Sequence, residues 1–276
     1  MENNIAFLEL KYGNIYGGLP NFFAIAEVAL LVFEKRSKKI FIESWVNKAD
    51  VDYVSVISKT NELGHTIGRE RIVVNMRTGR RRPYLEDFQV DKRALKYAFK
   101  QLRPVHNRVK RFLMDAFRKY RINTIVTFDG RRDIFLCERT GVRFNRMKII
   151  DLQKELNKVT DYLFSLNKLS VIINFDMDGS YLRSNNLEYW LHPIAAKQLI
   201  PGGAAWDAAR LMMVYNEYEN HQADFLLRAQ QLLNKIQAMK PAETPAPSAG
   251  AKDEQAPPAA KAAQEPTNGK ADEEQE

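Results

Sequence analysis

The chain has 276 residues, of which 45% are hydrophobic and 28% charged, enough apolar material for one large domain or two small ones. No apolar run approaches the roughly 20 residues that cross a bilayer, and M-E-N-N at the start is unlike a signal peptide, so no membrane association is expected. The single cysteine, Cys137, excludes an internal disulfide and fits the reducing cytoplasm, where we expect the protein.

The net charge of +8 conceals two regions of opposite sign. Residues 1–239 hold 38 basic and 26 acidic residues, a net charge of +12, whereas residues 240–276 hold 4 Lys and 8 acidic residues. The basic region predicts an anionic partner, nucleic acid first. The second region is rich in Ala, Pro and Glu and has no large apolar residue, so it predicts a disordered acidic tail available to a protein partner. We therefore expect one domain over residues 1–239 and a tail over 240–276.

Alternation along I-A-F-L-E-L-K, Ile5–Lys11, predicts a first strand with Glu9 on one face and Leu8 and Leu10 on the other. A Gly-rich connection is expected at residues 13–20. Two further strands are predicted from apolar runs separated by turn residues, Phe22–Phe33 and Ile40–Val46. This spacing predicts a meander or a pair of hairpins.

Residues 50–87 contain one possible strand, Arg71–Met76, followed by T-G-R-R-R-P, Thr78–Pro83. The segment predicts a partly irregular excursion, with an exposed hairpin as the alternative. Asp91 is placed to cap a long amphipathic helix that reaches about Tyr120 and that Pro104 kinks or divides. The candidate nucleic-acid-binding residues are cations of the hairpin and of the helix, namely Arg80, Arg81, Arg82, Lys100, Arg103, Arg108, Lys110 and Arg111. The alternative is a solvated face that keeps the protein soluble.

The segment T-I-V-T-F-D-G-R-R-D-I-F-L, Thr124–Leu136, predicts a buried strand, a turn at Asp129-Gly130 and the start of a helix near Arg131. Asp133 then lies in the first helical turn, beyond the carboxyl end of a strand, where open α/β sheets place ligands. A carboxylate that only caps or solvates the helix is the alternative. The elements expected after it are a strand and helix around Asp151, a strand or loop at Leu169–Phe175, a helix at Asn186–His192, and a long helix over residues 203–239.

Three segments stand in order along the chain. They are E-L-K-Y-G-N (Glu9–Asn14) with I-A-E-V-A-L-L-V-F (Ile25–Phe33), then I-V-T-F-D-G-R-R-D-I-F-L (Ile125–Leu136) with K-I-I-D-L-Q, and last G-G-A-A-W-D-A-A-R-L-M (Gly202–Met212). Together they resemble the motifs of the DEDD-type 3′–5′ exonucleases, the group of polymerase proofreading subunits and ribonuclease T. The resemblance implies a ribonuclease-H-like α/β fold, a mixed sheet flanked by helices.

The resemblance also implies a site where four carboxylates hold two divalent ions, Mg²⁺ or Mn²⁺, and a His or Tyr acts as general base. Asp133 and Asp207 match the second-motif and last-motif Asp, and Glu9 stands in place of the first Asp. These three are the candidate catalytic and metal-binding residues. Lys11 stands where the first motif has Glu, and Gly202 stands where the last motif has His.

An ammonium group repels a metal ion and cannot coordinate it while protonated. Lys11 therefore predicts weak Mg²⁺ or Mn²⁺ binding, or none. The function expected first is a pseudoenzyme of the exonuclease type that acts by binding single-stranded DNA or RNA, with impaired or absent hydrolysis. The alternatives are an active metal-dependent 3′–5′ exonuclease and a protein–protein scaffold that reuses the fold.

Overall fold

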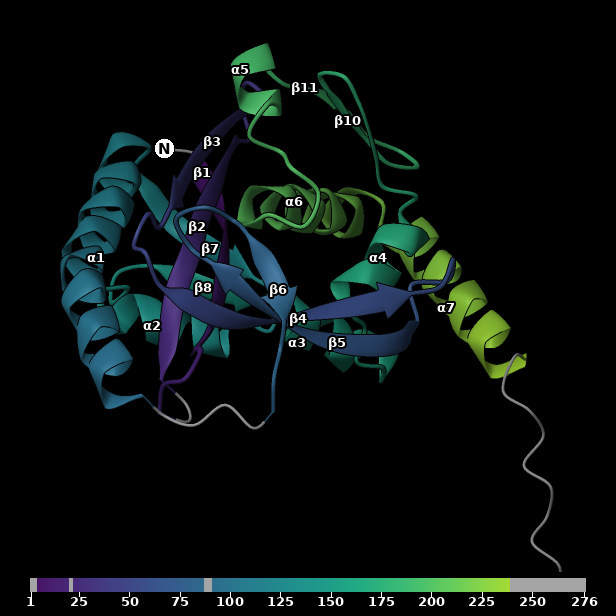
Figure 1. Ribbon diagram of the computed structural model, residues 1–276. Coiled ribbons are helices and arrows are strands. Elements are labelled where there is room, and N and C mark those ends of the chain that lie inside the picture. The colour runs from purple at the N-terminus through teal and green to yellow at the C-terminus, as the bar shows by residue number, and fades with distance from the viewer. Residues whose placement is uncertain (1–3, 20–21, 87–90, 239–276) are drawn as a thin grey trace, which may run out of the picture. The chain divides into compact units, whose positions relative to one another are not determined.

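A computed structural model describes residues 4–19, 22–86 and 91–238. The acidic tail expected from residue 240 lies outside these residues. The described residues form a mixed α/β fold with an eight-stranded sheet, a separate three-stranded sheet and helices on both faces of the larger sheet (Figure 1). None of the helices in the described ranges is both long and apolar enough to cross a membrane.

The first strand, β1 (Asn4–Ile15), lies at the centre of the larger sheet. On one side it pairs antiparallel with β2 (Phe23–Glu34), which pairs antiparallel with β3 (Lys39–Val46). On the other side it pairs in parallel with β7 (Ile122–Thr127), which pairs in parallel with β8 (Lys148–Asp151). The strands predicted at Ile5–Lys11, Phe22–Phe33 and Ile40–Val46 are confirmed as β1, β2 and β3, and all of them contribute buried side chains.

Residues 52–75 form a regular two-stranded arm, β4 (Asp52–Thr60) and β5 (Thr66–Asn75). The irregular excursion predicted there is wrong, and the alternative, a hairpin, is confirmed. A short strand, β6 (Arg81–Pro83), at the end of T-G-R-R-R-P, pairs with β5. The arm joins the sheet where β4 pairs with the last residues of β1. Gly13 permits this approach, because a Cβ there would lie 2.0 Å from the Val54 carbonyl oxygen. The Gly-rich connection predicted from residue 13 therefore begins later, after β1 ends at Ile15.

Helix α1 (Lys92–Lys119) covers one face of the larger sheet (Figure 1). Asp91 caps it as predicted, since its side chain accepts a 2.9 Å hydrogen bond from the Arg93 backbone N–H. The helix runs through Pro104 without interruption, so the expected division is wrong. Pro104 and Lys100, whose carbonyl loses its intrahelical donor, are both exposed, and water can replace the missing hydrogen bond there.

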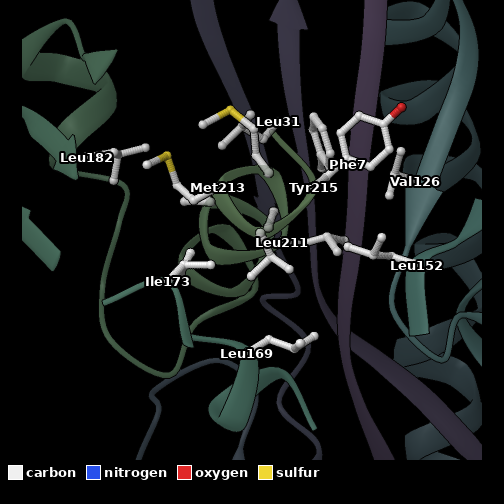
Figure 2. Packing of buried hydrophobic residues seen from close by; sticks show 14 of the residues in the cluster. Phe7, Leu31, Val126, Leu152, Leu169, Ile173, Leu182, Leu211, Met213 and Tyr215 are labelled. Atoms are coloured by element: carbon white, nitrogen blue, oxygen red, sulfur yellow. The ribbon is translucent and has the colours of Figure 1, made fainter. Parts of the chain in front are cut away.

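Helix α6 (Ala204–Asn220) packs against the opposite face of the sheet, with α7 (Gln222–Ala238) beside it. Figure 2 shows the core on this side, where Phe7 of β1 makes an edge-to-face contact with Tyr215 of α6 at 5.5 Å between ring centroids. The remaining helices are α2 (Arg131–Arg139), α3 (Leu152–Thr160), α4 (Leu166–Ile172) and α5 (Pro193–Ala196). Cys137 of α2 is buried, which fits a structural thiol.

Three further predicted elements, all after residue 160, differ from the structure. Residues Leu169–Phe175, expected as a strand or loop, fall mostly in α4, which the Ser165 side chain caps. Residues Asn186–His192, expected as a helix, contain the strand β11 (Glu188–Trp190), which joins β9 (Asp176–Asp178) and β10 (Tyr181–Arg183) in the small sheet. The buried carboxylate of Glu217 accepts hydrogen bonds from Ser184 and Asn186 and holds the turn before β11.

The long helix expected over residues 203–239 is two helices, which meet at His221. The backbone of His221 leaves the helical region, with φ −134° and ψ 42°, and its N–H still donates to the Glu217 carbonyl. The chain therefore turns there, and α7 packs on α6 rather than continuing it.

Candidate functional site

The elements that carry the motif residues meet around the central strand. Glu9 and Lys11 are two residues apart on β1 and share the face on which α6 packs. Asp133 lies in the first turn of α2, after β7, the parallel neighbour of β1, and Asp207 lies in the first turn of α6. The structure therefore brings Glu9, Lys11, Asp133 and Asp207 together, and the charges of the other three act on the Glu9 carboxyl.

Two protein cations hold the Asp207 carboxylate. The Lys11 ammonium makes an ion pair with Oδ2, and Arg210 Nη1 donates to Oδ1 at 3.0 Å. The Arg210 guanidinium is itself fixed, since it donates to Ser170 Oγ at 2.8 Å and to Asn167 Oδ1 at 2.6 Å. Each oxygen of the Asp207 carboxylate is thus paired with a positive charge that belongs to the chain.

The other two candidate carboxyls are crowded and poorly solvated. Glu9 Oε1 is buried and has no hydrogen-bond partner among the described residues. Burial and the charges of Asp133 and Asp207 raise the pKa of Glu9 well above its ordinary value, and the Lys11 charge only partly offsets this. Burial raises the pKa of Asp133 to about 7, against hydrogen bonding with the Leu10 backbone and the Lys11 charge. The neutral form of Glu9 is therefore favoured more than in an ordinary Glu, and part of the Asp133 population carries a proton at neutral pH.

A carboxylate that the motifs did not indicate, Glu27, also lies at this site. It stands on β2 opposite Lys11, and its Oε2 accepts a 2.9 Å hydrogen bond from the Ala204 backbone N–H. The carboxylate thereby caps the N-terminus of α6 and complements the helix dipole there. Its signal in the sequence was that it is the single charged residue in the apolar run Phe22–Phe33.

The position where the resemblance places a general-base His is held by Gly202, whose φ is +84°. Residues with a Cβ rarely adopt this conformation, whatever space surrounds them. The chain therefore lacks the imidazole at this position, and a His placed there would be strained by the positive φ of Gly202.

The donor set does not fit the two divalent ions that the resemblance implies. Of its three candidate ligands, Asp207 is already paired with Lys11 and Arg210, and a metal ion would have to displace both cations. In the described ranges, no group of three or more His, Cys, Asp or Glu side chains is arranged to hold a metal ion. The three predicted metal ligands, Glu9, Asp133 and Asp207, thus lie near one another, but their carboxyl groups are not arranged to coordinate a metal ion.

The cations of the β5–β6 turn differ in their contacts. Arg82 is anchored, because it pairs with Asp52 at 2.9 Å and its guanidinium lies 4.5 Å from the centroid of the Tyr16 ring. Arg80 and Arg81 are exposed, and neither has an ion-pair partner within the described part of the chain. Two of the three predicted phosphate-binding residues of this turn thus present unpaired charges to solvent.

The remaining candidates for nucleic-acid binding lie on α1, across the sheet from the Asp207 helix (Figure 1). The helix carries ten Lys and Arg residues and a single acidic residue, Asp115. Its five predicted phosphate-binding residues are all exposed, namely Lys100, Arg103, Arg108, Lys110 and Arg111. The basic surface and the Asp207 end of the carboxylate cluster therefore lie on different faces of the sheet.

Comparison with known proteins finds little that is similar. No protein-family model matches the chain, and no curated protein matches it. Among solved structures, the chain is similar to one described as "crystal structure of full-length 3'-exonuclease", with a TM-score of 0.40 and 12% sequence identity. The match covers 80% of this chain and 62% of that chain, so this chain spans less than two-thirds of its length. The likeness is too distant to place the chain in a family.

Proposed function

We propose that this chain is an exonuclease-like protein that binds single-stranded DNA or RNA and does not hydrolyse it efficiently. The observation that carries the proposal is the pairing of Asp207 with both Lys11 and Arg210. In the exonucleases that the motifs resemble, carboxylates at this site face metal ions, which activate water and stabilise the leaving oxygen. Here two cations of the chain neutralise the carboxylate that the last motif supplies.

The proposal takes the fold to be ribonuclease-H-like. Two observations support it: the mixed sheet has β1 at its centre, antiparallel to β2 and parallel to β7, and the three motif segments meet beside β1 although they span residues 9–212. Short segments that match by chance have no reason to converge in space. The basic charge of residues 1–239, net +12, supports an anionic partner.

Restoration of the ligand set tests the proposal. The wild-type chain is expected to show hydrolysis of single strands near background with Mg²⁺ or Mn²⁺. The variant Glu9→Asp with Lys11→Glu replaces a repelling charge by a ligand, so calorimetry with Mn²⁺ should show tighter metal binding than wild type. Glu9→Asp with Lys11→Gln is the control, since it removes the cation and adds no carboxylate. Metal-dependent 3′-end trimming by the wild type that disappears in Asp133→Ala overturns the proposal.

One observation favours a second candidate, an active metal-dependent 3′–5′ exonuclease. Glu9 and Asp133 are adjacent carboxyls with raised pKa values, and Glu9 Oε1 is buried without a partner. Such crowding costs stability, and it persists most readily where it serves a site. Trimming by the wild type supports this candidate, whereas a chain that neither cuts nor binds nucleic acid supports a protein–protein scaffold.

A further inference from the structure

The exposed face of α1 holds a surface hollow whose lining combines cations with aromatic rings. Its volume is about 600 Å³, and its lining residues are Arg93, Lys96, Tyr97, Phe99, Lys100 and Arg103. Tyr97 is 51% exposed and Phe99 is 41% exposed, although aromatic side chains of an amphipathic helix usually turn toward the core. The hollow is thus an open basic surface with accessible apolar rings.

The positions follow from the helical repeat. The cations at 93, 96, 100 and 103 recur every three or four residues and form one stripe along α1. The buried stripe of the same helix, which includes Ala98, Leu102 and Val105, packs on the sheet. Tyr97 and Phe99 lie about 200° apart around the helix axis, so one ring borders each side of the cationic stripe.

The Phe99 ring packs against the ring of Phe22. This edge contact, at 4.6 Å between centroids, fixes the orientation of the Phe99 ring while leaving part of it accessible. A ring that is ordered before binding loses little conformational entropy when another ring stacks on it. Beyond this hollow the stripe continues along α1 through Arg108 and Arg111, which line a second hollow of about 440 Å³.

We propose that this outer face of α1 is a single-strand-binding groove, in which Tyr97 and Phe99 stack on unpaired bases and the cationic stripe binds the phosphates. The combination fits this ligand because unpaired bases expose their faces to aromatic side chains, whereas a duplex buries those faces in its own stack. The inference rests on the proposed function and adds the location and the mode of binding.

The test uses the full chain and fluorescent oligonucleotides of about 12 nucleotides, within the size range of known single-strand sites. Fluorescence anisotropy measures affinity for a single strand and for the duplex of the same length. Tyr97→Ala with Phe99→Ala should weaken single-strand binding roughly 5- to 100-fold, the loss typical of removing stacked bases, and should change duplex binding little. Tyr97→Phe, which keeps the ring, should bind as wild type.

Two matched variants control for charge and for surface aromatics. Lys96→Glu with Lys100→Glu should weaken single-strand binding and reduce the dependence of the affinity on salt. Lys35→Glu with Lys48→Glu makes the same change in net charge outside the hollow, so it should weaken single-strand binding far less. Trp190→Ala removes an aromatic side chain that is 56% exposed elsewhere and should have no effect. Because Phe99 contacts Phe22, Tyr97→Ala alone is measured as well, after thermal unfolding confirms that it is folded.

The outcomes separate the two proposals. Single-strand binding that survives the loss of both rings overturns the groove but leaves the proposed function standing. A wild type that binds no single strand overturns the proposed function and the groove with it. Binding to vesicles that contain phosphatidylserine, without binding to oligonucleotides, assigns the basic helix to a membrane surface and also overturns the groove.

Discussion

At the scale of single residues, Lys11 determines what this site can do. Its ammonium and the Asp207 carboxylate are both partly buried, with 31% and 17% of their side-chain surfaces exposed. A pair in such surroundings is screened less than one at the surface, and removal of one partner leaves the other poorly compensated. Lys11 on β1 thus forms an internal ion pair with Asp207 at the position where the first motif of the resembled exonucleases has a carboxylate.

Lys11→Met should therefore lower the free energy of unfolding by about 1–3 kcal/mol, as measured by urea denaturation at neutral pH. The Arg210 guanidinium remains on Asp207 and limits the loss. Lys59→Met is the control, because Lys59 pairs with Glu70 at 3.6 Å with both side chains more than half exposed, and such pairs contribute little. Equal effects of the two variants would show that Lys11 is an ordinary surface cation.

The raised pKa of Asp133 predicts a dependence of stability on pH. The folded-state pKa is about 7, whereas an unfolded Asp titrates near about 3.9. Between these values the folded chain binds a proton that the unfolded chain releases, so stability falls as pH rises from about 4 to about 7. Asp133→Asn removes this titration. The free energy of unfolding of the variant minus that of the wild type should therefore increase by up to about 4 kcal/mol as pH rises from about 4 to about 7.

Chemical denaturation at several pH values measures this difference. Asp115→Asn is the control, since Asp115 lies on the exposed face of α1 in a surface pair with Arg118. A wild type and an Asp133→Asn variant whose stabilities change in parallel with pH would show that Asp133 is ionised throughout, and that burial does not set its pKa.

At the scale of elements, the tip of the β4–β5 arm docks on α4. Leu63 packs against the core on the α6 side, and Gly64, with φ +69°, lies against the backbone of Asn167 and Lys168. Asn167 in turn accepts the hydrogen bond from Arg210. The arm is thereby connected with the residues that hold Asp207.

Gly64→Ala should release this contact. A Cβ there would lie 2.8 Å from the Asn167 carbonyl, and the positive φ adds strain, so we expect a loss of about 1–3 kcal/mol and faster amide exchange at the arm tip. Gly68→Ala, in the same arm, is the matched control, because a Cβ there meets no atom within 4 Å. Unchanged exchange in Gly64→Ala would mean that the tip is not held by α4.

Local sequence patterns predicted the elements whose signals are local. Alternation marks β1, the Asp91 cap and apolar period mark α1, and the turn at Asp129-Gly130 marks the boundary between β7 and α2. The arm and β11 depend on pairing with distant strands, which no short window contains. Motif order predicted Glu9, Asp133 and Asp207 as candidate site residues, whereas the contacts of Glu27 and Arg210 arise only when α6 packs on the sheet and α4 on α6.

At the scale of the whole molecule, charge is distributed unevenly along the sequence. Residues 1–239 carry a net charge of +12, and residues 240–276 carry −4. Each phosphate that the basic region contacts should contribute a slope of roughly −0.7 to the dependence of log affinity on log salt for a single strand. A binding surface made of several cations on α1 therefore predicts affinity that falls steeply with salt.

Removal of residues 241–276 should tighten binding to a single strand, because an acidic segment competes with nucleic acid for the same cations. The effect should be greatest at low ionic strength and shrink as salt screens the charges, which anisotropy titrations at several salt concentrations measure. Binding that is lost when these residues are removed would instead make them the contact, as a scaffold requires.

One measurement tests the central claim most directly, that this chain binds single strands without cutting them. A single strand labelled at its 5′ end is incubated with the chain and Mg²⁺, and each sample is divided between anisotropy and a denaturing gel. The account predicts a fully bound strand of unchanged length, in wild type and in Asp133→Ala alike. A ladder of 3′-shortened products that requires Mg²⁺ and Asp133 would contradict it.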